Sequence, residues 1–184
     1  MPLGMDYAEQ ECSLARALEQ VGERWTLLIV RDCFFGVRRF TDFQAHLDIS
    51  RAVLAQRLTA LVDAGLLARV PRGGREEYEL TARGEALWPA LLALTRWGEA
   101  GSDRGPRRIF AHVGCGTDID ASGRCPACAT APGPRELEMR PGPAAATRRD
   151  DPVSRALRSR HRLLQPLPIG AHPDTPVPDP EPVT

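Results

Sequence analysis

The sequence predicts a mainly α-helical chain with one small β-hairpin, that is, an α+β fold. Apolar residues recur at helical spacing over most of residues 12–100. The helical spacing is interrupted by two short segments that flank a Gly-Gly pair, a pattern typical of a β-hairpin. The third observation concerns the remainder of the chain: 12 of the 17 prolines fall in residues 130–184. Such a composition buries too little apolar surface to offset chain entropy, so we expect a mostly disordered tail.

Two helices are predicted before residue 36. Residues 12–21 place apolar side chains at helical intervals and are followed by Gly22, a common C-terminal stop. Residues 25–35 are apolar almost all round. A helix of this kind is usually buried at the centre of a domain.

A pair of helices joined by a tight turn is predicted next. Thr41 and Gln44 occupy capping-box positions at the start of a short helix that ends near Leu47. Ser50 is well placed to cap the following helix, which runs to residue 64. The core side of that helix carries three leucines at i, i+4 and i+7, namely Leu54, Leu58 and Leu61.

The hairpin and a longer helix complete this region. Residues 66–70 and 76–80 are predicted strands, and a helix capped by Thr81 continues to about Gly98 with Trp88 and Trp97 on its apolar stripe. The resulting order of elements is that of a winged helix-turn-helix, in which the second helix of the pair lies in the DNA major groove.

The distribution of charge agrees with local DNA contact. All 24 basic residues are Arg and are balanced by 24 acids, so a uniformly basic surface is excluded. Residues 38–75, however, hold seven Arg against three Asp, a surplus that suits phosphate contact. Arg57 is ambiguous, because its helical angle allows either a structural role or a phosphate contact. The candidate DNA-binding residues are Arg38, Arg39, Ser50, Arg51, Gln56, Arg57, Arg72 and Arg75.

Several runs of sequence carry a family resemblance. They include CSLARAL from Cys12, GERWTLLI from Gly22, LAQRL from Leu54 and YELT from Tyr78. Together, over about residues 12–98, they resemble the HxlR-type family of winged helix-turn-helix transcriptional regulators, which is related to MarR.

The resemblance implies a cytoplasmic, homodimeric DNA-binding regulator. We expect a repressor of adjacent genes that responds to a small molecule or a redox signal, and a dimer formed by the N-terminal helix and the helix of residues 83–98. Cys12 matches a family cysteine that senses oxidants in several members, so it is a candidate redox sensor. A buried structural cysteine is the alternative.

A second motif lies behind the predicted DNA-binding domain. His112-x2-Cys115-x9-Cys125-x2-Cys128 offers two short ligand pairs of the kind that close a tetrahedral zinc site, with one Zn²⁺ per chain. A Cys125–Cys128 redox pair and inert thiols are the alternatives. The odd number of cysteines and the lack of a secretion signal argue against a disulfide framework.

These patterns divide the chain into a flexible N-terminus (1–11), the winged helix-turn-helix (12–104), a Cys/His-rich module (105–129) and the Pro/Arg-rich tail (130–184). No run of 18 apolar residues is present, so no membrane span is expected. The sequence lacks a G-x-S-x-G motif, a phosphate-binding Gly loop and an H-E-x-x-H motif, so we expect no enzyme. A thiol oxidoreductase or a zinc-dependent interaction adaptor, each using the Cys module, remain the alternative functions.

Overall fold

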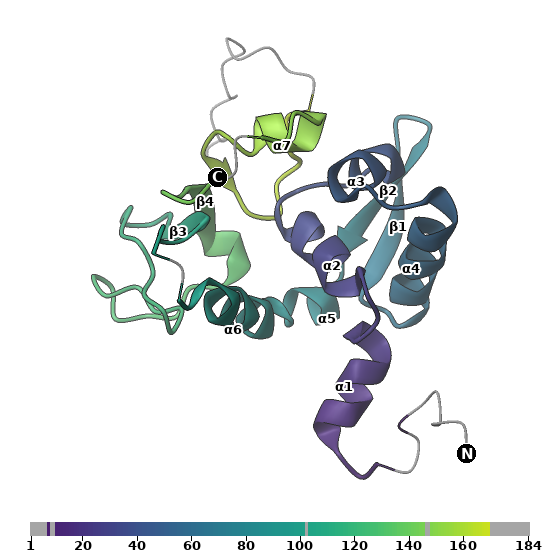
Figure 1. Cartoon of the computed structure of the whole chain (residues 1–184), viewed down its shortest axis with the longest axis horizontal. Coiled ribbons are helices and arrows are strands. Elements are labelled where there is room, and N and C mark those ends of the chain that lie inside the picture. The colour runs from purple at the N-terminus through teal and green to yellow at the C-terminus, as the bar shows by residue number, and fades with distance from the viewer. Residues whose placement is uncertain (1–6, 8–9, 102, 146–147, 170–184) are drawn as a thin grey trace, which may run out of the picture.

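The computed structural model describes residues 7, 10–101, 103–145 and 148–169. A helical body with a two-stranded hairpin occupies one side of the molecule, and a three-stranded sheet occupies the other (Figure 1). This confirms the predicted mainly α fold. In chain order the elements are α1 (Ser13–Val21), α2 (Thr26–Phe34), α3 (Phe40–Leu47), α4 (Arg51–Asp63), β1 (Leu67–Arg72), β2 (Arg75–Leu80), α5 (Ala82–Glu85), α6 (Trp88–Glu99), β3 (Arg108–His112), η1 (Pro134–Glu136), β4 (Leu137–Pro141), α7 (Pro152–Ala156) and β5 (His161–Arg162).

Helix α2 is the centre of the helical body. Ile29, Val30 and Phe34 are fully buried, and α2 contacts α3, α4 and β2. The three leucines of α4 that the sequence places on one face are buried as well. The apolar stretch therefore forms the predicted central helix, because neighbours cover it on several sides.

Strands β1 and β2 form the hairpin, which we call the wing. They pair antiparallel, and the pair next to the turn is Arg72 with Arg75. Gly73 and Gly74 between them have φ of 55° and 76°. Two consecutive positive φ values are the requirement of the tight turn that suits strand twist, and glycine meets it without strain.

Two helix boundaries differ from the sequence prediction. The capping box of Thr41 and Gln44 is wrong, because α3 begins at Phe40 with Arg39 at its N-cap. The predicted long helix is interrupted between α5 and α6, where Pro89 occupies the first turn of α6. Proline lacks the N–H that a continuous helix would need at this point.

The second sheet packs against the helical body through an aromatic stack. Its order is β3-β4-β5, with both pairs antiparallel. The ring of Trp88 on α6 lies between two other rings. Its centroid is 5.2 Å from that of Phe34 of α2 and 5.1 Å from that of Phe110 of β3. Trp88 is therefore a core residue that joins the two parts.

The prediction of a mostly disordered tail from residue 130 is wrong for residues 130–145 and 148–169. Leu137 and Met139 of β4 are fully buried, as is Val153 of α7. Apolar side chains separated by prolines reach the core here, and Pro152 sits in the first turn of α7, where a missing N–H costs little. Residue 129 is no domain boundary, because β4 pairs with β3. Residues 170–184, and most of the flexible N-terminus predicted at 1–11, lie outside the described residues.

A glycine allows the tail to reach the helical body. Leu164 N–H donates to the Phe34 carbonyl at 2.8 Å, and Leu167 N–H donates to the Gly36 carbonyl at 3.0 Å. A Cβ at Gly36 would lie 1.8 Å from the carbonyl oxygen of Gln165, and its φ is 85°. Only glycine permits this approach.

Candidate nucleic-acid interface and metal-ligand cluster

Helices α3 and α4 form a helix-turn-helix. Asp48 ends α3 with a φ of 53°, and two residues later the Ser50 hydroxyl accepts a hydrogen bond from Val53 N–H at 3.3 Å. The predicted Ser50 cap is confirmed. The first turn of α4 carries no acidic residue. Its N-terminus therefore presents partly positive N–H groups, which favour a phosphate.

Six of the eight predicted contact residues are exposed, and four of these have no acidic partner among the described residues. Ser50 and Arg51 are at the start of α4, Gln56 is one turn further along, and Arg75 is at the wing tip. The Arg51 guanidinium lies over the Phe40 ring, 5.1 Å from its centroid. This stacking holds an exposed positive charge beside the turn.

Three other predicted arginines are paired with acids of β2. Arg38 lies 2.6 Å from Glu79, Arg72 lies 2.9 Å from the same carboxylate, and Arg39 lies 3.3 Å from Glu77. The sequence count stopped at residue 75 and so omitted these acids. The positive surplus of the interface is smaller than the sequence suggests, and it is concentrated at the start of α4 and the wing tip.

The structure favours the structural role of Arg57, and it adds one exposed arginine, Arg69, to the candidate DNA-contact residues. The side chain of Arg57 is 16% exposed and lies 3.3 Å from Glu23, so it ties α4 to the loop before α2. Arg69 is exposed on β1 and donates to Thr59 Oγ1 of α4 at 3.3 Å. Strand alternation would not have identified it, because Arg69 shares a face with the buried Leu67, and only its place in the arginine-rich segment 38–75 marks it in the sequence.

Behind the helix-turn-helix lies a buried carboxylate. Asp32 of α2 is fully buried, with Arg31 at 2.7 Å on one oxygen and His46 Nδ1 of α3 at 2.7 Å on the other. Burial by itself raises the pKa of Asp32, but Arg31 and His46 outweigh it and hold that pKa below its ordinary value. This pair of contacts joins α2 to the first helix of the helix-turn-helix.

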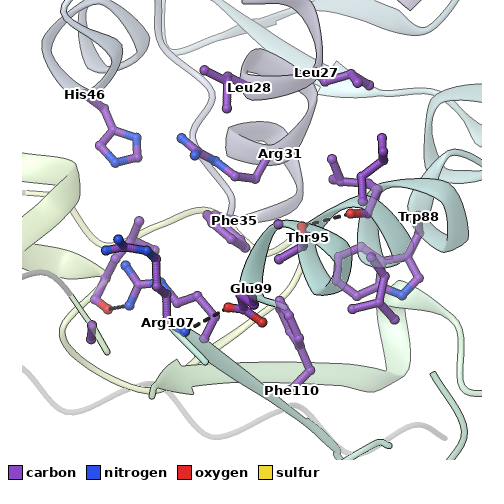
Figure 2. Close-up of a pocket in the computed structure, with 17 residues that line it drawn as sticks. Leu27, Leu28, Arg31, Phe35, His46, Trp88, Thr95, Glu99, Arg107 and Phe110 are labelled. Carbon is purple, nitrogen blue, oxygen red and sulfur yellow. Dashed lines mark hydrogen bonds between the residues drawn. The ribbon is translucent and has the colours of Figure 1, made fainter. Parts of the chain in front are cut away.

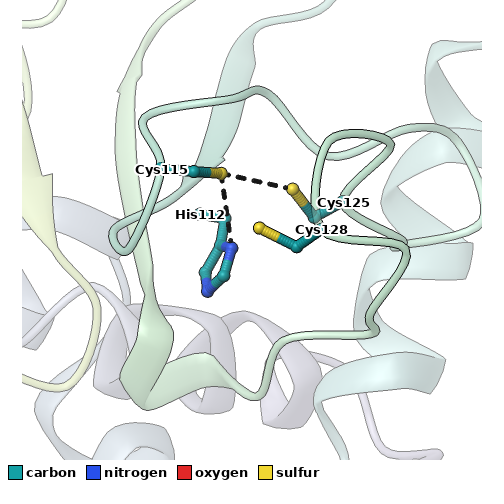
Figure 3. A group of neighbouring side chains, drawn as sticks. All are labelled: His112, Cys115, Cys125 and Cys128. Atoms are coloured by element: carbon teal, nitrogen blue, oxygen red, sulfur yellow. Dashed lines mark hydrogen bonds between the residues drawn. The ribbon is translucent and has the colours of Figure 1, made fainter.

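The four predicted metal ligands converge after β3 (Figure 3). One ligand atom from each of His112, Cys115, Cys125 and Cys128 lies within 4.8 Å of all the others. Cys115 Sγ is 3.4 Å from Cys125 Sγ and 3.5 Å from His112 Nδ1. Sulfur ligands of a tetrahedral Zn²⁺ stand about 3.8 Å apart when each bond is about 2.3 Å. The cluster therefore has the dimensions of a site that could bind a metal.

The two ligand pairs share one backbone geometry. His112 N–H donates to the Thr117 carbonyl at 2.9 Å, and Cys125 N–H donates to the Thr130 carbonyl at 2.8 Å. Each donor is five residues before its acceptor. The residue after the second ligand has positive φ in both pairs, 71° at Gly116 and 54° at Ala129. The repeat HVGCGT and CPACAT is the sequence signal of this symmetry, and spacing of the ligands alone does not include it.

The thiols of this cluster differ in acidity. Hydrogen bonds from Thr117 lower the pKa of Cys115 to about 6. Hydrogen bonds with Cys115 and Cys125 raise the pKa of Cys128 to about 11. Ionised sulfurs that lie close together repel one another, so the third thiol to lose its proton does so least easily. A bound cation would relieve this repulsion.

The remaining cysteines are separate from the cluster. Cys12 is exposed at the N-cap of α1, and Cys33 is buried in α2. Burial raises the pKa of the Cys33 thiol well above its ordinary value, so Cys33 is a core residue of low reactivity.

A winged helix with an exposed second helix defines a class, the DNA-binding transcriptional regulators. Comparison with known proteins agrees. The chain matches the HxlR-like helix-turn-helix family over residues 20–105. It is 43% identical over 136 residues to the HTH-type transcriptional regulator Rv3095 of Mycobacterium tuberculosis, covering 71% of this chain and 86% of that protein.

Two further similarities are more distant. The HTH-type transcriptional regulator YtfH of Escherichia coli is 35% identical over 95 residues, which are 50% of this chain and 75% of YtfH. The crystal structure of PA1607, described as a candidate transcription factor, is 35% identical with a TM-score of 0.51, covering 61% of this chain and 92% of that one.

The chain belongs to the HxlR-like helix-turn-helix family and is a DNA-binding transcriptional regulator. A match that covers 71% of the chain must reach beyond residue 105 wherever it begins. The mycobacterial similarity therefore extends past the family domain. Among the described residues, no helix has the length and apolar character needed to cross a bilayer.

Proposed function

We propose that this regulator binds specific operator sequences as a homodimer in the cytoplasm and represses genes next to its own. Helix α4 would enter the major groove, and the wing would contact the backbone or the minor groove beside it. The observation that supports this most is the exposed, capped start of α4 with Ser50 and Arg51, which carries no acidic residue. We assign the regulator no catalytic role.

Phosphate and base contacts should respond differently to mutation. Arg75→Ala is expected to weaken binding to all DNA sequences and to reduce the slope of log affinity against log salt by about one. Gln56→Ala should instead relax the preference at one or two base pairs and cost about 1–3 kcal/mol on the operator. Fluorescence anisotropy with the intergenic DNA beside its gene and with a scrambled duplex measures both effects.

Arg104→Ala is the control for charge, because Arg104 is exposed beyond α6 and away from α4 and the wing. If Arg75→Ala and Gln56→Ala bind both duplexes as the wild type does, the assigned interface is wrong.

The proposed dimer surface combines α1 with α6. Helix α1 projects from the helical body (Figure 1), and its Leu14 is 66% exposed. On α6, Leu94 is 51% and Trp97 is 78% exposed. Trp88, which the sequence placed on the same stripe, is buried in the aromatic stack and is removed from this surface. Exposed large apolar side chains that gather on one surface are typical of subunit interfaces.

Trp97→Ser is expected to weaken self-association at least tenfold, because exposed tryptophans dominate interfaces of this kind. Light scattering over a dilution series measures the change. Val53→Ser removes an exposed apolar side chain of α4 and should leave the mass unchanged. A wild-type chain that is a monomer at micromolar concentration, with or without operator DNA, would refute the dimer, in which two recognition helices stand about 34–36 Å apart.

We further propose that the four-residue cluster holds one structural Zn²⁺. The shared geometry of the two ligand pairs supports this, since a redox pair would need only Cys125 and Cys128 and would leave the matching His112–Cys115 turn without a role. The thiol oxidoreductase and the zinc-dependent adaptor stay as rivals that the metal and DNA measurements separate. Cys12 stays a candidate redox sensor, supported by its exposure at the start of α1.

A further inference from the structure

A cavity of about 430 Å³ lies between α2, α6 and β3 (Figure 2). Its walls are largely apolar, with Phe35 from the C-cap of α2, Trp88 and Leu91 from α6, and Phe110 from β3. This volume falls within the range of small-molecule sites, which are typically apolar with a few polar groups.

The polar groups of the cavity are mainly cationic. Arg31, Arg107 and Arg108 line it, against the single carboxylate of Glu99. Arg31 is already paired with Asp32, at 2.7 Å. The two carboxylate oxygens of Glu99 are also engaged. One accepts the Arg107 backbone N–H at 2.8 Å, and the other lies 3.4 Å from the Arg96 guanidinium.

Two arginine side chains therefore remain without a carboxylate partner within the described part of the chain. The Arg108 guanidinium donates to the Leu157 carbonyl at 2.7 Å. Neither this guanidinium nor the exposed side chain of Arg107 forms an ion pair with an acid among the described residues. Burial and the neighbouring charge of Arg31 lower the pKa of Arg108, and the Asp32 carboxylate offsets this only in part. Like charges gathered against an apolar wall favour an anion between them.

We propose that this cavity binds a small carboxylate with an aromatic or short aliphatic body. The body fits between Phe35, Trp88 and Phe110, and the carboxylate faces Arg108 and Arg107. A neutral ligand would leave Arg107 and Arg108 without an ion-pair partner, and a cationic ligand would add to the repulsion.

The cavity touches the helix-turn-helix directly. His46 of α3 lines it and is bonded to Asp32 of α2 at 2.7 Å. A three-residue turn separates α3 from α4. Arg107, Arg108, Phe110 and Leu157 lie outside the residues 20–105 that match the family. The extension of this chain thus completes a site beside α3, and, resting on the proposed function, we assign the carboxylate the role of effector.

The test uses full-length, DNA-free protein and two probes of equal shape, 2-naphthoate and 2-naphthamide. Isothermal titration is expected to show naphthoate bound at least tenfold more tightly than the amide. Arg108→Gln should weaken naphthoate binding about tenfold or more, because a hydrogen bond to a charged group is worth about 1.5–3 kcal/mol. Its effect on naphthamide should be small.

Arg107→Gln provides a second variant at an exposed position, in case loss of Arg108 impairs folding, and naphthoate should bind it several-fold more weakly. Arg104→Gln is the matched control, since Arg104 is exposed on the same segment and does not line the cavity. The site is refuted if naphthoate fails to bind at millimolar concentration, if both probes bind equally, or if Arg108→Gln and Arg107→Gln leave naphthoate binding unchanged.

Two more outcomes decide the occupant and the role. Leu94 lines the cavity and also belongs to the proposed dimer surface, so the two proposals meet at this residue. Naphthoate binding that weakens as protein concentration rises would mean that the second copy of the dimer occupies the cavity, and this would overturn the ligand proposal. DNA affinity is measured separately with and without naphthoate. A change supports the effector role, and naphthoate that binds without changing it refutes that role. Failure to bind DNA both with and without naphthoate refutes the proposed function alone.

Discussion

Cys128→Ser is expected to abolish stoichiometric zinc binding. Wild-type protein should carry about one Zn²⁺ per chain by native mass spectrometry, and the variant should bind it roughly 100-fold more weakly or worse. Loss of a ligand does more harm than loss of a supporting hydrogen bond, which already costs about 10–100-fold. The remaining two sulfurs and one nitrogen would leave one position of the tetrahedron open.

Chelation should disorder the two ligand turns and leave the rest folded. Between β3 and β4 the described residues that are buried are Ile119, Cys125 and Pro132, so burial stabilises these turns little. Strands β3 and β4 have other support, because Phe110, Leu137 and Met139 are packed in the core. Amide hydrogen exchange should therefore rise in residues 113–130, while α4 and the wing stay protected and DNA affinity changes little.

Cys12→Ser is the control for the metal measurement, because Cys12 is an exposed cysteine on α1 outside the cluster. It should keep the full zinc content. Finding no metal in the wild type, together with a Cys125–Cys128 disulfide that forms reversibly, would replace the zinc proposal with the redox pair.

Asp32→Ala is expected to cost about 3 kcal/mol of unfolding free energy at pH 7. Removing one partner of a buried charged pair typically costs about 3–5 kcal/mol, because the other charge loses its compensation. We expect the lower end, since the Arg31 side chain is 31% exposed and keeps some contact with water. The variant would also release His46 and so loosen α3 from α2.

The effect of Asp32→Ala should depend on pH in a defined direction. The pKa of Asp32 is depressed in the folded chain. Its contribution is therefore complete above the unfolded value of about 4 and disappears as the pH falls through the folded value. Urea unfolding at pH 7 and at successively lower pH measures the difference from the wild type.

Asp63→Asn is the control, because Asp63 is exposed at the end of α4. The free energy of unfolding of this variant should differ from that of the wild type by less than about 0.5 kcal/mol. Equal stability of wild type and Asp32→Ala at pH 7 would mean that the buried carboxylate contributes nothing net.

The sequence alone determined the helical body, the wing and the four-residue cluster that could bind a metal. These depend on local signals: leucines at helical spacing in α4, the Ser50 cap, the Gly73-Gly74 tip and ligand pairs two residues apart. Each signal acts over a few residues, so each is readable without knowing the fold. The same holds for the family resemblance, which the comparisons confirm.

Contacts between residues that are far apart in the sequence became known only from the tertiary structure. Glu79 of β2 neutralises Arg38, 41 residues earlier, so a charge count along the chain overstated the DNA-facing surplus. The apolar residues of the tail are too sparse to fold by themselves, yet Leu137 and Leu157 are buried because they join the core cluster that also holds Phe34, Trp88 and Phe110. Composition measures whether a segment can bury its own surface, and it carries no information on a core that another part of the chain supplies.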